Sequence, residues 1–447
     1  MLKNEEDIKM INRRDFIQKS LIGYGGLALG SPVLSSVKPF LFSKNLEYRK
    51  SSHISSDSYT VLTTCPPYGS QNVGDKLIEQ RTKELITYVK GKVEFLTIFR
   101  EEPLEPWLEK INSTRAVLMP AFPIRDTPMY PGVYQLVNDL SQIKVPMIPV
   151  GANWNVYPGD EASRRAVNYS APTRTFLSFI AGQVEQLSCR EFYTCDILSK
   201  HGITNTIMTG DPAWFLLSAI GKPMYRPQNV KRVVFSPPLS PFYLAQAKLI
   251  LDMLAGLFPD AERICAFHLL DAASKENITS KSERSAALTP EVTEKNRVIR
   301  EYAAELGFKV IQMAGNIENL EFYQTCDLHV GYECHAHLNF FSRRIPSVLI
   351  AEDARGVGFN YSLGIGGFNG FMRVQPEPQG RTKKITSGYC TSVDELVIAP
   401  PKMNVHEEIK EFLIHELRSG FRRYIGLSSY LDDIFKNSMK PFIESLP

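Results

Sequence analysis

Two runs of alternating strand-like and helix-like segments constrain the fold of this chain more than any other feature. In the first run, β-branched residues 59–65 (YTVLTTC) precede residues 75–89 (DKLIEQRTKELITYV), which have helical spacing. A proline-rich passage, residues 221–232, interrupts the rhythm, and a second run begins at RVVFSPP. Strands that alternate with helices form parallel sheets covered by helices. The sequence therefore predicts an α/β protein with two doubly wound, Rossmann-like lobes and a cleft between them.

The length of the chain agrees with two lobes. Its 447 residues, 43% of them hydrophobic and 22% charged, exceed what one small core organises. We predict an N-terminal lobe over residues 58–222, a C-terminal lobe over residues 230–400 and helices over residues 401–447. Within the lobes, we predict a helix over residues 131–143 and a flexible glycine-rich loop over residues 354–370.

Residues 1–45 differ from the rest of the chain. Arg13 and Arg14 precede Phe16, and a mildly apolar stretch over residues 21–34 follows that is too short to span a bilayer comfortably. This arrangement is similar to a bacterial twin-arginine export signal. We expect export by that route to the periplasm or the membrane surface, with the membrane contacted only through the leader. A cytoplasmic protein with an amphipathic anchor or a disordered leader is the alternative.

The charge balance argues against nucleic acid as a partner. The formal net charge is +3, and no long basic run is present. An anionic small-molecule substrate is compatible with this balance, because local pockets rather than net charge decide such binding.

The loop over residues 65–78 (CPPYGSQNVGDKLI) is the first candidate for chemistry. In open parallel sheets, ligands bind beyond the carboxyl ends of the strands, so loops that follow strands are where a site is expected. Asn72 or Asp75 can cap the next helix, Gly74 permits close approach of the backbone to a ligand, and the free N–H groups can bind an anion. A capped helix without a ligand is the alternative.

Two further loops each place one charged residue after a strand. Arg190 lies between a strand and a helix in LSCREFYTCDIL, a suitable position for binding an anion, although a surface salt bridge is the alternative. Asp211 follows a strand in MTGDPAWFL and is expected to point toward the interlobe region. Asp-Pro turns are also common for structural reasons.

The stretch over residues 331–341 (GYECHAHLNFF) raises the question of a metal site. Glu333 and His337 are four residues apart and share a helix face, whereas His335 lies on the other side. Zinc requires three or four converging ligands, so we predict no metal and no other cofactor here. His335, at a junction between strand and helix, is better placed to face a cleft.

Three of these segments resemble the polysaccharide pyruvyl transferase family. YGSQNVGDKLI is similar to the family's N-x-G-D start, and LSCREFYTCDILSKHGITNTIMTGDPAWFL is similar to its block that ends in D-P-A. ENLEFYQTCDLHVGYECHAHLNFFSRRIPSVLI is similar to its C-terminal block, which contains R-L-H-A. The resemblance spans residues 60–360 and implies a two-lobed, glycosyltransferase-B-like fold. It also implies transfer of a pyruvyl group from phosphoenolpyruvate to a saccharide of a cell-surface polysaccharide, with formation of a ketal.

The resemblance implies roles for individual residues. Arg190 would bind the phosphate or the carboxylate of the donor. His335 would be the acid or an anion ligand, and Asp75 is a candidate base. Asn72 and Asp211 would shape the substrate site, together with Gly74 and Glu333.

One position departs from the family pattern. The family's R-L-H falls on Glu333, Cys334 and His335, so a carboxylate stands where an arginine is expected. Three nearby cations are candidates for compensation: Arg343, Arg344 and Arg355.

Two alternatives to pyruvyl transfer follow from this departure. The first is an exported relative that has lost pyruvyl transfer and binds glycan, which predicts an acidic or neutral pocket around Glu333. The leader favours this alternative, because phosphoenolpyruvate is a cytoplasmic metabolite. The second is a nucleotide-sugar glycosyltransferase on the same fold, with Glu333 near the donor ribose. Pyruvyl transfer instead predicts a basic cleft around Arg190 and His335.

Overall fold

The computed structural model describes residues 57–66, 69–125, 129–269, 289–376 and 390–447. These residues belong to one compact unit, His53–Pro447. The predicted leader over residues 1–45 lies outside the described residues. Within the described residues, no helix combines the length and the apolar composition needed to cross a bilayer.

The first half of the described chain is built on a parallel sheet with strand order β2-β1-β3-β5. Two short parallel pairs, β4 with β6 and β7 with β8, accompany it. The strands are β1 (Ser58–Thr63), β2 (Glu94–Phe99), β3 (Val117–Pro120), β4 (Pro123–Ile124), β5 (Met147–Val150), β6 (Asn153–Trp154), β7 (Leu187–Cys189) and β8 (Thr206–Met208). The α-helices are α2 (Val73–Lys90), α3 (Leu108–Asn112), α4 (Glu161–Ala166), α5 (Ala171–Ala181) and α6 (Phe192–Lys200).

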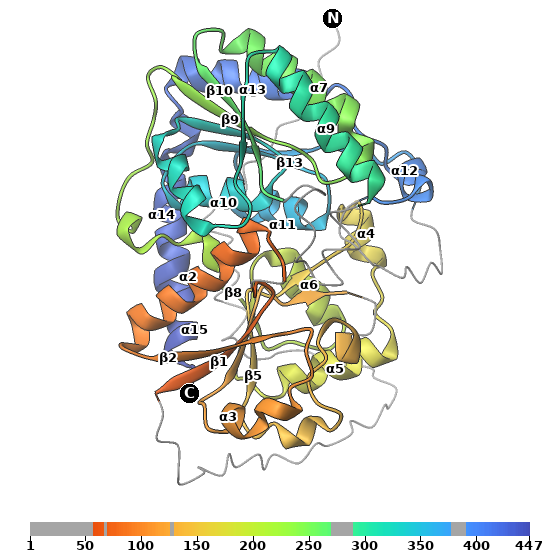
Figure 1. The fold of residues 1–447 in the computed structure, drawn as a ribbon, viewed down its shortest axis with the longest axis vertical. Coiled ribbons are helices and arrows are strands. Elements are labelled where there is room, and N and C mark those ends of the chain that lie inside the picture. Colours follow the sequence, from red (N-terminus) through yellow and green to blue (C-terminus); the bar gives the residue numbers. More distant parts are fainter. Residues whose placement is uncertain (1–56, 67–68, 126–128, 270–288, 377–389) are drawn as a thin grey trace, which may run out of the picture. The chain divides into compact units, whose positions relative to one another are not determined.

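The second half contains a six-stranded parallel sheet with order β11-β10-β9-β12-β13-β14. Its strands are β9 (Arg232–Ser236), β10 (Glu262–Phe267), β11 (Lys309–Gln312), β12 (Leu328–Gly331), β13 (Ser347–Ala351) and β14 (Gly367–Asn369). The helices α7 (Leu244–Leu257) and α9 (Pro290–Glu305) lie side by side against it (Figure 1). The other helices are α10 (Cys334–Ser342), α11 (Ala354–Leu363), α12 (Val393–Ile398), α13 (Val405–Ser419), α14 (Ile425–Ile434) and α15 (Lys440–Glu444).

These two sheets confirm the predicted α/β fold with two Rossmann-like halves. Numbered along the chain from β9, the second sheet has the order 3-2-1-4-5-6 of dinucleotide-binding folds, in which the order reverses between the first and fourth strands. In the first sheet, the reversal lies between β1 and β3. Ligand sites in open α/β sheets form at such reversals, beyond the carboxyl ends of the strands. The exact domain boundaries stay predictions.

The prediction of a helix over residues 131–143 is wrong. A single π-helical turn, Met129–Val133, contains non-helical residues, and the next helical residues are the short 3₁₀ turn Leu140–Gln142. Between these turns, Tyr134 and Leu136 are buried in the core, and Leu136 accepts a backbone hydrogen bond from Leu104. Tertiary packing in an irregular conformation therefore overrides the apparent helical spacing.

The prediction of a flexible loop over residues 354–370 is also wrong, because this segment forms α11 and β14. Asp353 caps α11 by accepting a hydrogen bond from the Arg355 N–H at 2.8 Å. Gly364 ends the helix in the left-handed conformation, with φ of 69°. A Cβ atom on Gly358 would lie 2.7 Å from the Glu191 carboxylate, so this glycine allows α11 to pack closely on the first half of the chain.

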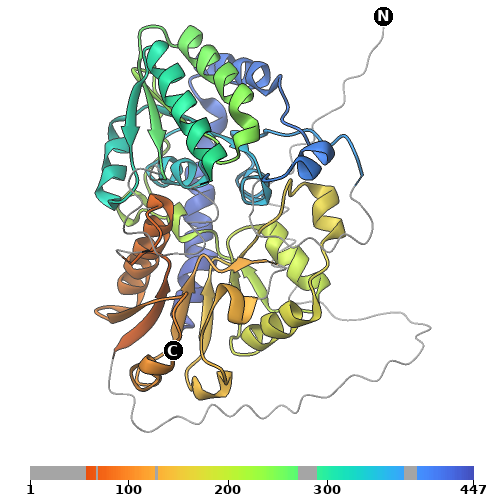
Figure 2. The same cartoon turned by 45° about the vertical axis from the view of Figure 1, so that its right-hand side comes forward.

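The C-terminal segment is helical, as predicted, and it connects the two halves. Helix α13 packs on α7, whereas α15 packs on α2 of the first half (Figure 1, Figure 2). The Lys90 ammonium donates hydrogen bonds to the backbone carbonyls of Glu444 and Leu446, and the Tyr59 hydroxyl donates to the Pro447 carbonyl. The sequence predicted residues 401–447 as a separate helical segment. The end of this segment, α15, in fact packs on the first half of the chain.

Candidate active site

A cavity of about 200 Å³ lies beyond the carboxyl ends of strands from both sheets. The first half contributes residues that follow β1 and β3, and the second half contributes residues that follow β9, β12 and β13. Both sheets therefore meet the cavity at the points where their strand orders reverse. Five residues singled out from the sequence line its wall: Asn72, Asp75, Arg190, Glu333 and His335. The two others, Gly74 and Asp211, lie directly behind lining residues.

The N-terminus of α2 forms one side of the cavity. Of the two residues considered as caps, Asn72 is the N-cap, and its side-chain oxygen accepts a hydrogen bond from the Gly74 N–H at 2.8 Å. Asp75 accepts a hydrogen bond from the Ser70 hydroxyl at 2.8 Å. Asn72 and Asp75 are thus fixed at the cavity wall by short-range contacts.

Gly74 brings α2 into contact with His335. A Cβ atom placed on Gly74 would overlap the His335 imidazole ring, so only glycine permits this approach of helix and ring. His335 is 7% exposed, and its Nε2 atom has no hydrogen-bond partner among the described residues. The ring is therefore held from behind by the helix backbone, with one nitrogen free for a ligand.

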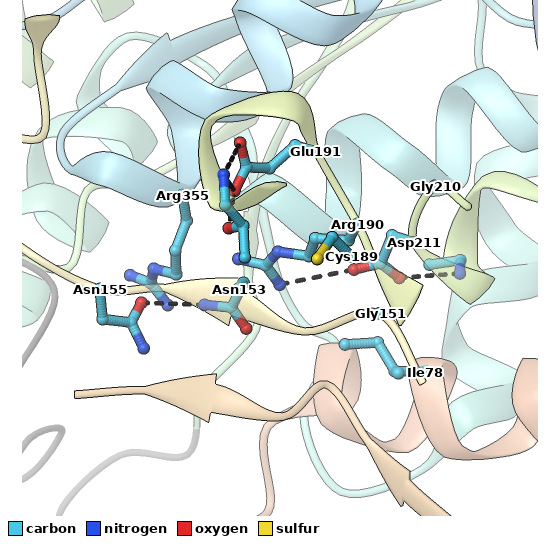
Figure 3. Close-up of polar contacts among 12 residues, drawn as sticks. Ile78, Gly151, Asn153, Asn155, Cys189, Arg190, Glu191, Gly210, Asp211 and Arg355 are labelled. Carbon is cyan, nitrogen blue, oxygen red and sulfur yellow. Dashed lines mark hydrogen bonds and ion pairs between the residues drawn. The ribbon is translucent and has the colours of Figure 1, made fainter. Parts of the chain in front are cut away.

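Arg190, which lines the cavity, forms a buried pair with Asp211 (Figure 3). Arg190 is 2% exposed, which excludes the alternative of a surface salt bridge. One terminal nitrogen lies 3.4 Å from the Asp211 carboxylate, and the guanidinium carbon lies 4.6 Å from the centre of the Phe359 ring. Nε and Nη2 have no protein hydrogen-bond partner among the described residues. Burial lowers the pKa of Arg190 and raises the pKa of Asp211.

Three more arginines line the same cavity: Arg100, Arg125 and Arg355. Burial, reinforced by the positive charges of Arg100 and Arg355, lowers the pKa of Arg125 to about 10. Burial acts against the charge of Arg355, but the bidentate Asp353 carboxylate raises the pKa of its guanidinium. Within the described residues, neither Arg100 nor Arg125 forms an ion pair with a carboxylate. The same cavity is also lined by five carboxyl groups, so positive and negative side chains are close to balanced in number: Asp75, Glu79, Glu333, Glu352 and Asp353.

Only one of the three arginines expected to compensate for Glu333 reaches the cavity. Arg355 lines it. Arg343 instead pairs with Glu321 at 2.8 Å, and Arg344 pairs with Asp432.

Glu333 lies half-buried at the start of α10 and faces the cavity. Burial, and then the charge of Glu352, raises the pKa of Glu333 to about 7. Burial and the adjacent Asp353 likewise raise the pKa of Glu352 to about 7, although Glu352 accepts hydrogen bonds from the backbone N–H groups of Leu239 and Ser240. Both carboxyl groups therefore keep their proton to a higher pH than an ordinary glutamate does.

The two histidines of the same helix have different surroundings. Burial, followed by the charges of Arg190 and Arg355, lowers the pKa of His335 well below its usual value, so its imidazole is neutral. His337 is fully buried away from the cavity, and its Nδ1 bonds the Ser347 hydroxyl at 2.8 Å. In the part of the chain that the structure describes, no three His, Cys, Asp or Glu side chains are grouped so as to hold a metal ion.

Sequence reasoning missed Arg100, Arg125 and Glu352, which belong to no recognised motif. A positional signal was present, since each directly follows a strand: β2, β4 and β13, respectively. The rule that singled out Arg190 would also have selected these three residues.

The model of the family described as polysaccharide pyruvyl transferase matches residues 72–353, from the N-cap of α2 to the N-cap of α11. This chain belongs to the polysaccharide pyruvyl transferase family. In this family member, the match includes Arg190, Asp211 and all of α10. Glu333, the position at which the sequence resemblance placed the family's arginine, lines the cavity at the start of α10.

Comparison with solved structures finds similarity at low sequence identity. The structure of S. aureus MnaA with UDP is 11% identical in sequence to this chain, with a TM-score of 0.45. The match covers 87% of this chain and 97% of the MnaA chain. The UDP-GlcNAc 2-epimerase of Neisseria meningitidis has 10% identity, coverages of 87% and 99%, and a TM-score of 0.39. The wall teichoic acid polymerase TagF has 12% identity, coverages of 88% and 90%, and a TM-score of 0.37. Similarity at this level says nothing about substrate. A comparison with curated proteins finds no match.

Proposed function

We propose that this family member transfers a pyruvyl group from phosphoenolpyruvate to two hydroxyls of a saccharide in a cell-surface polysaccharide or its precursor. The observation that carries the proposal is the set of four arginine guanidiniums on one cavity: Arg100, Arg125, Arg190 and Arg355. The donor carries a phosphate and a carboxylate, and arginine binds both groups through paired, charge-assisted hydrogen bonds. Five carboxyl groups also line the cavity, so the grouping of the arginines, and not an overall positive charge, distinguishes the proposal from the acidic or neutral pocket of a glycan-binding relative.

Arg190 and the start of α10 supply the phosphate-binding part of the proposed site. Arg190 is buried, and two of its nitrogens have no partner among the described residues. Glu333 is the N-cap of α10 but makes no capping hydrogen bond with its side chain, so the first-turn amides of α10 are left for a ligand. The free N–H groups and dipole of a helix N-terminus favour an anion. His335 adds a neutral imidazole as a hydrogen-bond partner.

The reaction places further demands on the cavity. The methylene carbon of the donor must gain a proton, and the neighbouring carbon must form two C–O bonds to the saccharide while its bond to phosphate breaks. Two hydroxyl protons are released, of which one replaces the proton consumed and the other leaves with phosphate. Asp75, at the cavity wall, is the proposed base for the first hydroxyl. Because its imidazole is neutral, His335 is assigned to anion binding rather than to proton donation.

Calorimetric titration of the full-length protein with phosphoenolpyruvate tests the proposal. We expect saturable binding that Arg190→Lys weakens by roughly ten- to a hundredfold, because a lost hydrogen bond to a charged group costs about 1.5–3 kcal/mol. Lysine keeps the charge beside Asp211 and so protects the fold. Arg343→Ala is the matched control, because Arg343 pairs with Glu321 away from the cavity. Absence of binding at millimolar donor contradicts the proposal, and saturable binding of a UDP-sugar or a glycan instead favours one of the two alternatives.

The leader and the donor make opposite demands on location. We propose that residues 1–45 direct twin-arginine export, whereas phosphoenolpyruvate is found in the cytoplasm. A reporter fused to residues 1–45, compared with the same fusion carrying Arg13→Lys and Arg14→Lys, tests this. Export that depends on the arginine pair supports the leader. Retention of both fusions in the cytoplasm contradicts it and favours cytoplasmic action on the donor.

A further inference from the structure

Resting on the proposed function, we propose that Glu333 is a catalytic acid that binds the donor as a neutral carboxyl group and gives its proton to the donor's methylene carbon. The residue that departs from the family pattern would then supply the proton that the reaction consumes. Four structural observations support this assignment.

The first observation is that the Glu333 carboxyl group is uncommitted. Its backbone N–H donates to the Ser236 hydroxyl at 3.1 Å, which fixes the start of α10. Its side chain neither caps the helix nor forms a salt bridge within the described residues. Glu191, at the same position of α6, behaves differently, because its carboxylate accepts from the backbone N–H groups of Tyr193 and Thr194. The Glu333 carboxyl is therefore free to contact a ligand in the cavity.

The second observation is the charge around Glu333. Titratable groups from several elements interact electrostatically with Glu333. They include Asp75 of α2, Lys295 of α9, Tyr323 of the 3₁₀ helix Ile317–Thr325, Glu352 directly after β13, and Arg355 of α11. Burial and Glu352 favour the neutral form, and Arg355 and Lys295 oppose it. The balance raises the pKa of Glu333 to about 7. A neutral carboxyl adds no negative charge beside an anionic donor, so replacing the family's arginine need not prevent binding.

The third observation is that Glu352 cannot easily take the same role. Its two carboxylate oxygens accept the backbone N–H groups of Leu239 and Ser240 at 2.8 and 3.0 Å. These hydrogen bonds hold Glu352 at the wall, where its charge acts on Glu333. Glu352 is therefore a positioning and tuning residue for Glu333.

The fourth observation is that the other expected acid, His335, is in its weakly acidic neutral form. Burial, Arg190 and Arg355 keep His335 neutral. A neutral imidazole whose pKa is far below 7 is a poor match for proton transfer at neutral pH, whereas an acid whose pKa lies near the working pH is well matched. Within the cavity wall, Glu333 satisfies this condition and also has an uncommitted side chain.

The O–H bond of Glu333 breaks as a C–H bond forms at the methylene carbon, and the electron pair of the donor's double bond makes the new bond. The neighbouring carbon becomes positive and is attacked by a saccharide hydroxyl, whose proton passes to Asp75. The bond to phosphate then breaks, and phosphate leaves with that proton. The second hydroxyl closes the ketal and returns its proton to the Glu333 carboxylate.

The test compares the full-length wild type with Glu333→Gln, a nearly isosteric change at a half-buried position, and with Glu333→Arg, which restores the family residue. Phosphoenolpyruvate binding is measured by calorimetry from pH 6 to 9 in two buffers of different ionisation heat. We expect wild-type affinity to fall up to tenfold per pH unit above pH 7, with proton uptake on binding. Glu333→Gln should keep wild-type affinity at low pH and lose this part of the pH dependence.

Turnover supplies the second measurement. Formation of the ketal on a saccharide acceptor should fall 10²- to 10⁴-fold in Glu333→Gln, the usual contribution of a general acid. Thermal melting checks that both variants are folded. A Glu333→Gln variant that keeps wild-type turnover and pH dependence overturns the assignment and leaves the proposed function standing. Higher turnover in Glu333→Arg also overturns it. If the wild type binds no phosphoenolpyruvate at any pH, both proposals are wrong.

Discussion

Replacing Gly74 by alanine tests whether the contact between α2 and His335 positions the imidazole for an anionic ligand. The added Cβ would overlap the His335 ring, so either the ring or the helix must move. Gly74 lies in the first turn of α2, two residues after Asn72, in the segment that resembles the family's N-x-G-D start. The same contact therefore connects the first recognised motif with the last.

Two opposing contributions determine the effect on stability. Alanine is favoured over glycine within a helix by up to about 1 kcal/mol, whereas forcing an extra methyl group into a packed interior costs about 1–3 kcal/mol. We expect a net loss of unfolding free energy of about 0–3 kcal/mol. The expected effect on the free energy of donor binding is a loss of about 1.5–3 kcal/mol, because displacing His335 removes a hydrogen bond to an anion. Phosphoenolpyruvate affinity should therefore fall roughly ten- to a hundredfold.

Gly256→Ala is the matched control. Gly256 lies in α7, and no atom lies within 4 Å of a Cβ built on it. This variant should be as stable as the wild type or up to about 1 kcal/mol more stable, with unchanged donor affinity. Urea unfolding and calorimetry measure both quantities. Wild-type affinity in Gly74→Ala, in a folded protein, would refute the view that this contact positions His335.

Two further predictions concern buried groups, the first in the core and the second at the cavity wall. Ser347→Ala should lower the unfolding free energy by about 2–4 kcal/mol, since Nδ1 of His329 and Nδ1 of His337 both bond the Ser347 hydroxyl and would lose their partner. Urea unfolding should show this loss without a change in donor affinity. Unchanged stability would mean that water replaces the hydroxyl. Glu352 has a pKa raised to about 7 in the folded protein, above its unfolded value, so it contributes stability below about pH 4.5 that is lost as the pH rises through 7. Relative to Glu352→Gln, the wild type should lose on the order of 3 kcal/mol between pH 4.5 and pH 8, and parallel urea stability profiles would contradict the raised pKa.

The fold was predictable from the sequence because its strongest signal is local. Strand and helix periods that alternate along the chain specify parallel sheets. Asn72 caps α2 through a hydrogen bond to a residue only two positions away. The glycine-rich segment 354–370 was misread because its glycines were taken as a sign of flexibility. They instead serve close packing, as Gly358 does against Glu191.

The site was predictable only in part, because its chemistry depends on contacts between distant segments. His335 and His337 are two residues apart, but only the first lines the cavity, and the second bonds Ser347 in the core. Glu333 looked like a charge that would repel the donor. Its raised pKa arises from burial and from Glu352, nineteen positions later in the chain by the numbering, and no local pattern encodes that neighbour.

The position of α15 has a consequence for how the two halves can be inherited. Phe442 and Ile443 are each 1% exposed, and α15 packs on α2, so the first half is completed by residues that follow the whole second half. A single crossover in the proline-rich passage near residue 225 would therefore give a hybrid whose α2 meets a foreign α15. Exchange of an intact half between relatives would need a second junction, between α14 and α15. The two halves are thus expected to change together rather than as interchangeable modules.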